Sequence, residues 1–333
     1  MGEFELIDRY FRQPAAAGVD ASSGVVLGIG DDCALLAPAP GLQLAVSSDL
    51  LVEGRHFLST VDPARLGHKA LAVNLSDLAA MGARPLGFTL ALSMPRADEA
   101  FLAPFSRGLL ALAARHAIPL VGGDTTAGPL TVGITVFGEL PPGRALRRDA
   151  ARAGDRLWVS GRLGDARLAL EVFRGTRALD AGDFADARRA MELPEPRVAL
   201  GQALQGIAHA AIDLSDGLLG DLGHVLRASR VGAEVELDAL PCSAAVAALD
   251  EAGRHACLLH GGDDYELLFS APAGHDAAVR DAGARAGVVV TPIGRLVETP
   301  GLRVRDAAGR AIDVAANGFD HFANPAPGAA VGD

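Results

Sequence analysis

Seven short acidic segments, most of them flanked by glycine or other small residues, are spread along this 333-residue chain. In chain order they read GIGDDCA, SSDLLVEGRHF, NLSDLAAMGA, GGDTTAG, DLSDGLLGDLG, GGDDYELLF and NGFDHF. Two carboxylates about 4 Å apart repel by roughly 4 kcal/mol at an effective dielectric near 20, so a fold that gathers several of them needs a cation. Because Mg²⁺ is bound by such oxygens and usually accompanies phosphate, the pattern predicts a site for a metal-bound phosphate compound.

Charge and composition narrow the class of protein further. The net charge is -11 and the chain has no Lys/Arg-rich run, which argues against nucleic acid as a partner. Cys33, Cys242 and Cys257 are odd in number and widely separated, so neither a disulfide framework nor a zinc site is expected. The N-terminal residues do not read as a signal peptide, and apolar stretches are interrupted too early for a membrane helix. We expect a soluble cytoplasmic protein that does not contact the membrane.

The length predicts two domains rather than one. The segment from Pro141 to Asp155 is rich in Pro, Gly and charge between two apolar runs and is the candidate boundary. We expect an N-terminal α/β domain over residues 1–145 and a C-terminal α+β domain over 146–325, where helices and strands do not alternate strictly. Residues 326–333, in the Ala/Gly/Pro-rich tail, are expected to be disordered.

Several acidic residues are predicted to follow strands or to lie on helices. A strand over 42–48 is expected to end at Asp49, and one over 118–121 at the GGDTT segment that contains Asp124. A helix over 63–82, opened by Asp62, places Asn74 and Asp77 on one face. Further elements are expected as strands over 85–94, 130–140, 156–160 and 211–214 and as helices over 98–116, 165–173, 196–208 and from 216.

Asp77 is the most informative single acid because it lies inside the apolar helical pattern LAVNLSDLAAMG. A buried carboxylate without a partner is strongly disfavoured, so this face is either exposed or covered by something positive. The other segments have simpler alternatives: a tight surface turn at GIGDD, a cap or Ser/Asp turn at Ser47 to Asp49, and a favourable helix dipole for Asp216. Most of the segments nevertheless share one pattern of small residues beside an acid, which favours a common site.

Taken together and in order, these motifs resemble those of the thiamine-monophosphate kinase family, a branch of the aminoimidazole ribonucleotide synthetase superfamily. The resemblance extends from GEFELIDRYF near the N-terminus to NGFDHF. It implies ATP-dependent phosphorylation of thiamine monophosphate to thiamine diphosphate, the last step of thiamine diphosphate biosynthesis, with several Mg²⁺ ions. It also implies a homodimer in which the N-terminal sheets of the two copies join in a barrel, and a site in the cleft between the two domains.

The resemblance also implies roles for individual residues, carried over motif by motif. The expected Mg²⁺ ligands are Asp32, Ser47, Ser48, Asp49, Asp77, Asp124, Asp213 and Asp216. The expected ATP contacts are Gly123, Asp124, Arg148 and Ser215, and the expected substrate contacts are His56, Asp263 and Phe319. Asp31 could act through water. Members of the family often have Glu at the position of Asp263 and Tyr or Trp at that of Phe319. The Asp263 side chain is therefore one methylene shorter than that Glu, and Phe319 lacks the polar atom of Tyr or Trp.

The implied chemistry is a direct in-line transfer in which the anionic phosphate of the acceptor attacks, so no covalent nucleophile and no general base are expected. His56 is interpreted as a substrate contact and Cys33 as a packed thiol. Two alternatives stay open: another ATP-using enzyme of the same superfamily, and a non-catalytic protein that binds Mg²⁺ and nucleotide. Selenophosphate synthesis is disfavoured because residues 1–31 contain neither Cys nor Lys.

Overall fold

The computed structural model describes residues 3–12 and 24–312, which contain two large β-sheets connected by residues 141–154. The expected fold of two units, each with helices packed on a sheet, is confirmed. The described part includes no helix with the length and apolarity needed to span a membrane. The tail at 326–333 and Phe319 lie outside the described residues.

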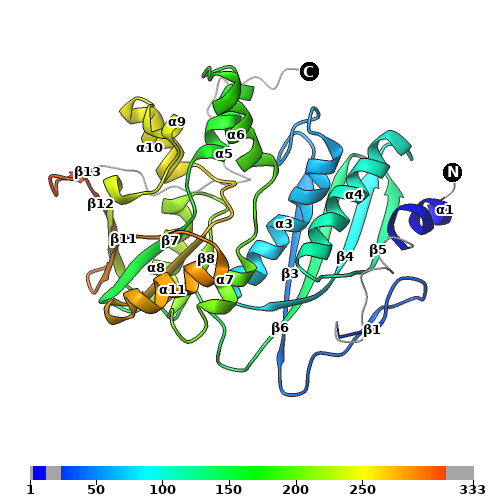
Figure 1. The fold of residues 1–333 in the computed structure, drawn as a ribbon, viewed down its shortest axis with the longest axis horizontal. Coiled ribbons are helices and arrows are strands. Elements are labelled where there is room, and N and C mark those ends of the chain that lie inside the picture. Colours follow the sequence, from blue (N-terminus) through cyan, green and yellow to red (C-terminus); the bar gives the residue numbers. More distant parts are fainter. Residues whose placement is uncertain (1–2, 13–23, 313–333) are drawn as a thin grey trace.

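The first unit is a four-stranded sheet with two long helices on one of its faces (Figure 1). Its strands, in spatial order, are β3 (Gln43–Val52), β6 (Thr131–Leu140), β4 (Arg84–Met94) and β5 (Leu120–Ala127). Only β4 and β5 pair in parallel, and the helices α3 (Pro63–Met81) and α4 (Glu99–Arg115) cover the sheet. Before it come α1 (Glu3–Ile7), a π-helical turn η1 (Asp8–Arg12) and the hairpin of β1 (Val25–Leu27) and β2 (Leu35–Leu36).

Two of the expected strand ends are wrong. Strand β3 continues through Asp49 to Val52, because it pairs with β6 without interruption from Gln43 to Val52. Strand β5 includes the whole GGDTT segment and pairs with β4 as far as Ala127. A Cβ at Gly123 would lie 1.9 Å from the carbonyl oxygen of Leu90, so glycine lets the strand pass where a side chain would block it. Both Asp49 and Asp124 therefore lie within strands.

The second unit is a seven-stranded sheet surrounded by shorter helices (Figure 1). Its spatial order is β13 (Ala311–Ile312), β12 (Gly301–Arg305), β9 (Gly232–Glu236), β11 (Val290–Val297), β7 (Asp155–Ser160), β10 (Leu267–Pro272) and β8 (Ala210–Asp213). Its helices are α5 (Asp165–Phe173), α6 (Ala181–Glu192), α7 (Val198–Ala203), α8 (Leu218–Ser229), α9 (Ala244–Ala247), α10 (Glu251–His260) and α11 (Asp276–Ala286), with 3₁₀ turns η2 (Leu237–Ala239) and η3 (Ala273–His275).

Most expected elements of this unit are present, with two differences. The helix expected over 196–208 is limited to α7, and the helix expected from Asp216 begins at Leu218. The later start reflects Gly217, whose φ of 103° is not helical and which precedes the first helical residue. Asp216 therefore belongs to the loop before α8 and not to its first turn.

Helix α3 has the ends that the sequence predicts. Asp62 is the N-cap, and its carboxylate accepts hydrogen bonds from the N–H groups of Ala64 and Arg65 at 2.8 and 3.2 Å. Pro63 occupies the first helical position, and Gly82 closes the helix with φ 72° in the left-handed region. From Leu66 to Ala80 every residue except His68 and Asp77 is buried, so most of α3 is a core helix.

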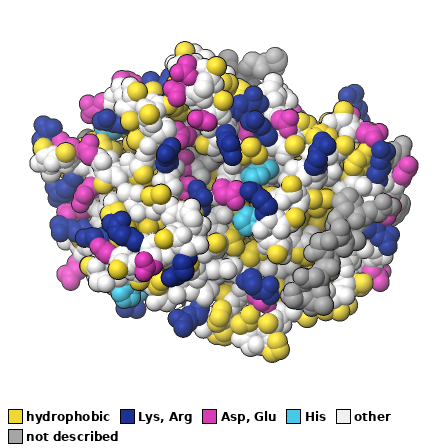
Figure 2. Space-filling view, in the orientation of Figure 1, with side chains coloured by type: hydrophobic (Ala, Val, Ile, Leu, Met, Phe, Trp, Pro, Cys, Tyr) yellow, Lys and Arg dark blue, Asp and Glu magenta, His cyan; other side chains and the backbone are white. Residues whose placement is uncertain are grey.

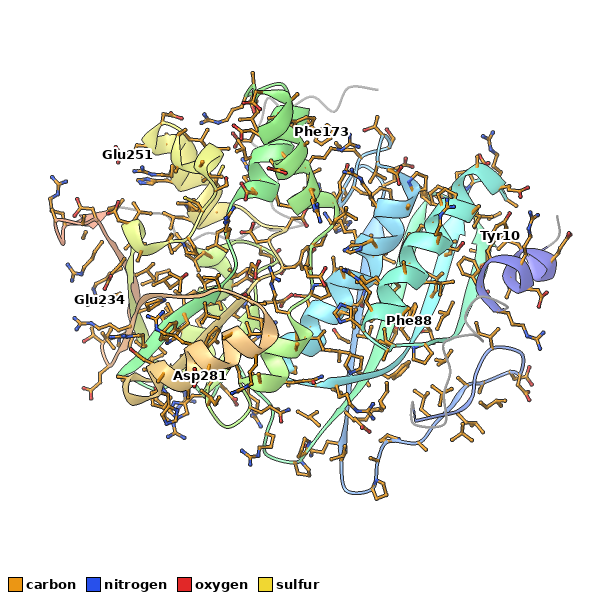
Figure 3. The ribbon with its side chains drawn as sticks, viewed as in Figure 1. Tyr10, Phe88, Phe173, Glu234, Glu251 and Asp281 are labelled. Atoms are coloured by element: carbon orange, nitrogen blue, oxygen red, sulfur yellow. The ribbon has the colours of Figure 1, made fainter. Side chains whose placement is uncertain are left out.

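Three glycines allow other helices to approach α3 closely. A Cβ at Gly67 would lie 2.1 Å from the Phe105 oxygen, and one at Gly108 would lie 1.9 Å from the Ala64 oxygen, so α3 and α4 pack backbone to backbone. On the other side, a Cβ at Gly201 of α7 would lie 2.0 Å from the Ala79 oxygen. One continuous apolar core accordingly includes Phe88 of the first sheet, labelled in Figure 3, and Phe269 of the second. Helix α3 thus joins the two units.

Charged and histidine side chains lie along the line between the two units on the face shown in Figure 2. Ion pairs cross this line between Arg65 and Glu192, with the Nη1 to Oε2 distance 2.8 Å, and between Arg115 and Glu195 at 2.9 Å. The Arg115–Glu195 pair is exposed and contributes little stability, whereas Glu192 of the other pair is buried. Both pairs add to the connection that the apolar contacts of α3 make.

We expect Gly201→Ala to lower the free energy of unfolding by about 1–3 kcal/mol, the usual cost of adding a methyl group to a packed interior. Gly182→Ala on α6 is the matched control, because a Cβ there meets only Asp180 Oδ1 at 3.4 Å. It should leave stability unchanged or raise it slightly, since alanine is favoured over glycine in helices. Urea unfolding followed by circular dichroism measures both, and equal effects of the two substitutions would contradict the close approach of α7 to α3.

Candidate active site

A cavity of about 540 Å³ lies where β3 and α3 face the loops that follow β8 and α10, and we call it the site cavity. Its lining includes eight of the residues that the sequence selects: Ser48, Asp49, His56, Asp77, Asp213, Ser215, Asp216 and Asp263. The first four belong to the first unit and the last four to the second. The structure therefore brings together acids that are far apart in the sequence, at the boundary between the two units.

Asp77 and Asn74 face β3 from adjacent turns of α3, as their spacing predicts. The Ser47 hydroxyl donates to Asp77 Oδ2 at 2.5 Å, and the backbone N–H of Asp49 donates to Asn74 Oδ1 at 3.0 Å. The Ser48 hydroxyl instead donates to the backbone oxygen of Ile134 at 3.1 Å, since alternate residues of a strand point to opposite faces. Ser47 and Asp77 thus form one polar unit beside Asp49.

The carboxyl groups of the site cavity have raised pKa values because burial disfavours their charged forms. Burial, followed by repulsion from Asp77, raises the pKa of Asp213 to about 8. Burial and the charge of Asp77 raise the pKa of Asp49 to about 6. The pKa of Asp77 is raised by burial too, although the Ser47 hydrogen bond and the Arg148 charge oppose the shift. A divalent cation bound among these carboxyl groups would stabilise their charged forms.

Asp221 belongs to the same region, although it is not among the site residues expected from the sequence. Its Oδ2 accepts hydrogen bonds from the backbone N–H groups of Ser215 and Asp216 at 3.1 and 3.0 Å. Burial is the main cause that raises its pKa to about 7. Asp221 therefore shapes the loop that carries Ser215 and Asp216. The signal was present in the sequence, because Asp221 is the third acid of the DLSDGLLGDLG segment.

Two predicted substrate contacts lie in the wall of the site cavity. His56 Nδ1 accepts a hydrogen bond from the Val52 N–H at 3.0 Å, which fixes the ring orientation. Asp263 accepts from Lys69 Nζ at 2.8 Å and from the Tyr265 hydroxyl at 3.2 Å. Neither Lys69 nor Tyr265 was selected from the sequence, although Tyr265 lies within GGDDYELLF and Lys69 precedes NLSDLAAMGA by five residues.

Arg148, expected at the ATP, does not line the site cavity, but its charge lowers the pKa of both Asp77 and Asp221. It therefore lies within electrostatic reach of acids from both units. The oxygen of Arg148 accepts a hydrogen bond from the Ser229 hydroxyl at 2.7 Å, which ties the connecting segment to α8.

Asp32, Gly123 and Asp124 lie elsewhere. They line a second cavity of about 1010 Å³, bounded by η1, the loop between β1 and β2, and strands β4 and β5. We call it the sheet-face cavity. Strand β5 is one edge of the first sheet and β3 is the other, so within one chain Asp124 and Asp49 belong to opposite edges. The single cluster of acids expected from the sequence is thus divided between two cavities.

The donor set fits a hard cation, since the site cavity offers carboxylate and hydroxyl oxygens of the kind that Mg²⁺ prefers. Among residues 3–12 and 24–312, no group of three or more His, Cys, Asp or Glu side chains is already arranged at metal-binding distances. The residues that would hold Mg²⁺ on the site-cavity side are Asp49, Asp77, Asp213 and Asp216.

Comparisons with known proteins agree with this architecture. The model of the AIR synthase related protein N-terminal domain matches residues 30–140, and that of the C-terminal domain matches residues 152–307. The thiamine-monophosphate kinase of Salmonella typhimurium is 46% identical over 330 residues, covering 97% of this chain and 99% of that protein. The thiamine-monophosphate kinase of Haemophilus influenzae is 44% identical over 329 residues, covering 97% and 98%.

Solved structures show the same likeness over nearly the whole chain. The crystal structure of thiamine-monophosphate kinase from Stenotrophomonas maltophilia has a TM-score of 0.84 and 45% identity, covering 94% of this chain and 98% of that one. AaThiL complexed with AMPPCP and TMP has a TM-score of 0.73 and 27% identity, covering 96% and 97%. Fold and site define a two-domain protein of the AIR synthase related class. The chain belongs to the thiamine-monophosphate kinase family of that class.

The raised pKa of Asp213 predicts how the stability of the metal-free protein depends on pH. The pKa rises from 3.8 to about 8, so between these values the folded state holds a proton that the unfolded state has lost. Stability should therefore fall as pH rises through this window. An asparagine at this position cannot ionise, so the Asp213→Asn variant should gain in stability relative to the unmodified protein from pH 5 to pH 8.5.

Melting temperatures in the presence of a chelator measure this difference. Asp281→Asn, at an exposed position on α11 labelled in Figure 3, is the control and should leave the pH profile unchanged. A difference between Asp213→Asn and the unmodified protein that stays constant across the window would show that Asp213 is not a buried ionising group.

Proposed function

We propose that this protein transfers the terminal phosphoryl group of ATP to thiamine monophosphate and so forms thiamine diphosphate. The observation that carries this proposal is the site cavity, in which Asp49, Asp77, Asp213 and Asp216 converge from both units. The family relationship supports it, as does the relative whose structure holds AMPPCP and TMP, an ATP analogue and the acceptor. We expect the reaction to take place in the cytoplasm.

Mg²⁺ bound by the carboxylates would neutralise the phosphate charge and hold the two substrates together. The proposed ligands are Asp32, Ser47, Ser48, Asp49, Asp77, Asp124, Asp213 and Asp216. Gly123, Asp124, Arg148 and Ser215 are proposed for ATP, and His56, Asp263 and Phe319 for the acceptor. The charge of Arg148 acts on Asp77 and Asp221, which supports the proposed contact with ATP phosphates.

The chain's own residues are proposed to bind and orient the substrates rather than to form a covalent bond. The acceptor is a phosphate oxygen that is already anionic at neutral pH, so no group has to remove a proton from it. His56 is held through Nδ1 by the Val52 N–H, an arrangement that suits a fixed contact. We therefore propose direct in-line transfer without a phosphorylated enzyme.

We further propose that two copies assemble through the first domain, residues 1–145, with the second domain, 146–325, outside. The sheet face opposite α3 and α4 carries exposed apolar side chains on β3, namely Leu44, Val46 and Leu50, which are 49–57% exposed. An apolar sheet face with open edges favours association with a second copy. Joining the two sheets into a barrel would cover this face.

The same assembly would complete the site. Asp49 pairs with Ile134, which pairs with Leu90, which in turn pairs with Gly123 next to Asp124. Asp49 and Gly123 thus lie in one row at opposite edges, about 14 Å apart at roughly 4.8 Å per strand spacing. A barrel of two sheets brings the β5 edge of one copy toward the β3 edge of the other. We propose that Asp32 and Asp124 act together with Asp49, Asp77 and Asp213 of the second copy.

A turnover assay with thiamine monophosphate, ATP and Mg²⁺ tests the proposed reaction through formation of ADP and thiamine diphosphate. We expect Asp77→Asn to remain folded but to lower kcat at least ~100-fold, about 2.7 kcal/mol of activation free energy, because a charged oxygen ligand is lost. Asp281→Asn should keep full activity. Binding of ATP and Mg²⁺ without product would instead indicate a non-catalytic protein, and full activity of Asp77→Asn would exclude its metal role.

Mixing two inactive variants tests whether the site is shared. In a mixed dimer of Asp49→Asn and Asp124→Asn, one site receives both substitutions and the other receives neither. With random exchange of subunits, about a quarter of all sites should recover activity, because half of the dimers are mixed. A mixture of differently tagged subunits, refolded together, provides the measurement. No recovery despite isolated mixed dimers would place Asp49 and Asp124 in the same copy's site.

A further inference from the structure

A buried lysine lies directly behind the site cavity. Lys69 is on α3, its side chain is only 4% exposed, and it does not line the site cavity itself. Its Nζ donates to Asp263 Oδ2 at 2.8 Å, so an ammonium of the first unit is paired with a carboxylate of the second. A buried ammonium without a partner would be strongly unfavourable, and this pairing therefore fixes where Asp263 lies.

The loop that carries Asp263 is held in an unusual backbone conformation. Asp263 has φ 67° and Tyr265 has φ 50°, both in the left-handed region that side chains other than glycine rarely adopt. Hydrogen bonds from the N–H of Asp263 to the Ser215 oxygen at 3.0 Å and from that of Tyr265 to the Leu214 oxygen at 2.8 Å keep the loop in place. Strain of this kind persists only where the surroundings require it and is common at binding sites.

The second oxygen of Asp263 is fixed as well. The Tyr265 hydroxyl donates to Oδ1 at 3.2 Å, so each carboxylate oxygen already accepts one hydrogen bond from the protein. A carboxylate oxygen accepts two, and one position on each remains for a ligand. With its side chain 37% exposed, Asp263 presents this remaining capacity to the site cavity.

The charge of Lys69 also separates Asp263 from the other acids. Within the described part of the chain, the ion pair of Lys69 is with Asp263 and not with Asp49, Asp77 or Asp213, which line the same cavity. Those three acids have no ion pair with Lys69 and are the ones proposed to hold the metal ions. Asp263, neutralised by Lys69, is instead suited to an uncharged N–H donor. The acceptor of the proposed reaction has such a donor, the amine of its aminopyrimidine ring, at the end away from the phosphate.

We propose that Lys69 and Tyr265 are positioning residues that aim the Asp263 carboxylate at the aminopyrimidine amine of thiamine monophosphate and so select this substrate. The inference rests on the proposed function of the same site. It assigns to Lys69 a role in recognising the organic part of the acceptor, not in binding ATP or in the transfer itself.

Replacing Lys69 by methionine keeps the length of the side chain but removes its charge. We expect Lys69→Met to raise the KM for thiamine monophosphate about 10- to 100-fold, the usual effect of losing a hydrogen bond with a charged group, and to leave the KM for ATP within about twofold. Tyr265→Phe, which removes only the hydroxyl, should raise the same KM by a smaller factor.

Oxythiamine monophosphate has a carbonyl oxygen in place of the pyrimidine amine and cannot donate a hydrogen bond to Asp263 from that position. This analogue therefore separates a role in positioning Asp263 from a general loss of activity. The unmodified enzyme should prefer thiamine monophosphate in kcat/KM, and Lys69→Met should lose most of this preference. Arg65→Met is the matched control: it breaks another ion pair from α3 to the second unit, with Glu192, but lies outside the site cavity. The Arg65→Met variant should keep the preference of the unmodified enzyme for thiamine monophosphate over the analogue.

The outcomes are distinct. If Lys69→Met keeps the preference and the KM for thiamine monophosphate within about twofold, or raises the KM for ATP equally, the inference is overturned. If Lys69→Met does not fold, an unchanged preference in Tyr265→Phe overturns it instead. Failure of the proposed function is recognised separately, since the unmodified protein would then form no thiamine diphosphate from either acceptor.

Discussion

The close packing of α3 between two other helices is the constraint on which the rest of the structure depends. Glycines 67, 108 and 201 let α4 and α7 meet the backbone of α3. Helix α3 is therefore fixed relative to both sheets, and the position of Asp77 on it is fixed as well. A carboxylate that must act together with Asp213 of the other unit needs such a rigid support, since errors of about 1 Å weaken a binding site severely.

The site places several carboxyl groups where their charged forms are disfavoured, and the structure offsets part of this cost. Backbone N–H groups of Ser215 and Asp216 stabilise Asp221, the Ser47 hydroxyl stabilises Asp77, and Lys69 stabilises Asp263. The pKa of Asp213 is nonetheless raised to about 8. The protein alone therefore does not satisfy this group, which is why we regard the cavity as built for a cation.

Much of the site could be predicted from the sequence, because its acids occur in short segments with local rules. The spacing of Asn74 and Asp77 correctly predicted a shared helix face, and the caps of α3 followed from Asp62, Pro63 and Gly82. The order of strands could not be predicted, since pairing depends on contacts between distant segments. For that reason the division of Asp49 and Asp124 between two sheet edges was missed. Lys69 was missed because only the folded chain shows its partner.

Strand β3 shows why assembly and chemistry are coupled in this fold. Its residues alternate between two faces, so Ser47 reaches Asp77 of α3 while Val46, Ser48 and Leu50 point to the face opposite α3 and α4. A slip of one residue in its pairing with β6 would exchange the two sets and turn Ser47 away from Asp77. The apolar contacts that would hold a second copy and the polar contacts that shape the site therefore depend on one register. A change that disturbs either set is transmitted to the other through the same ten-residue ladder.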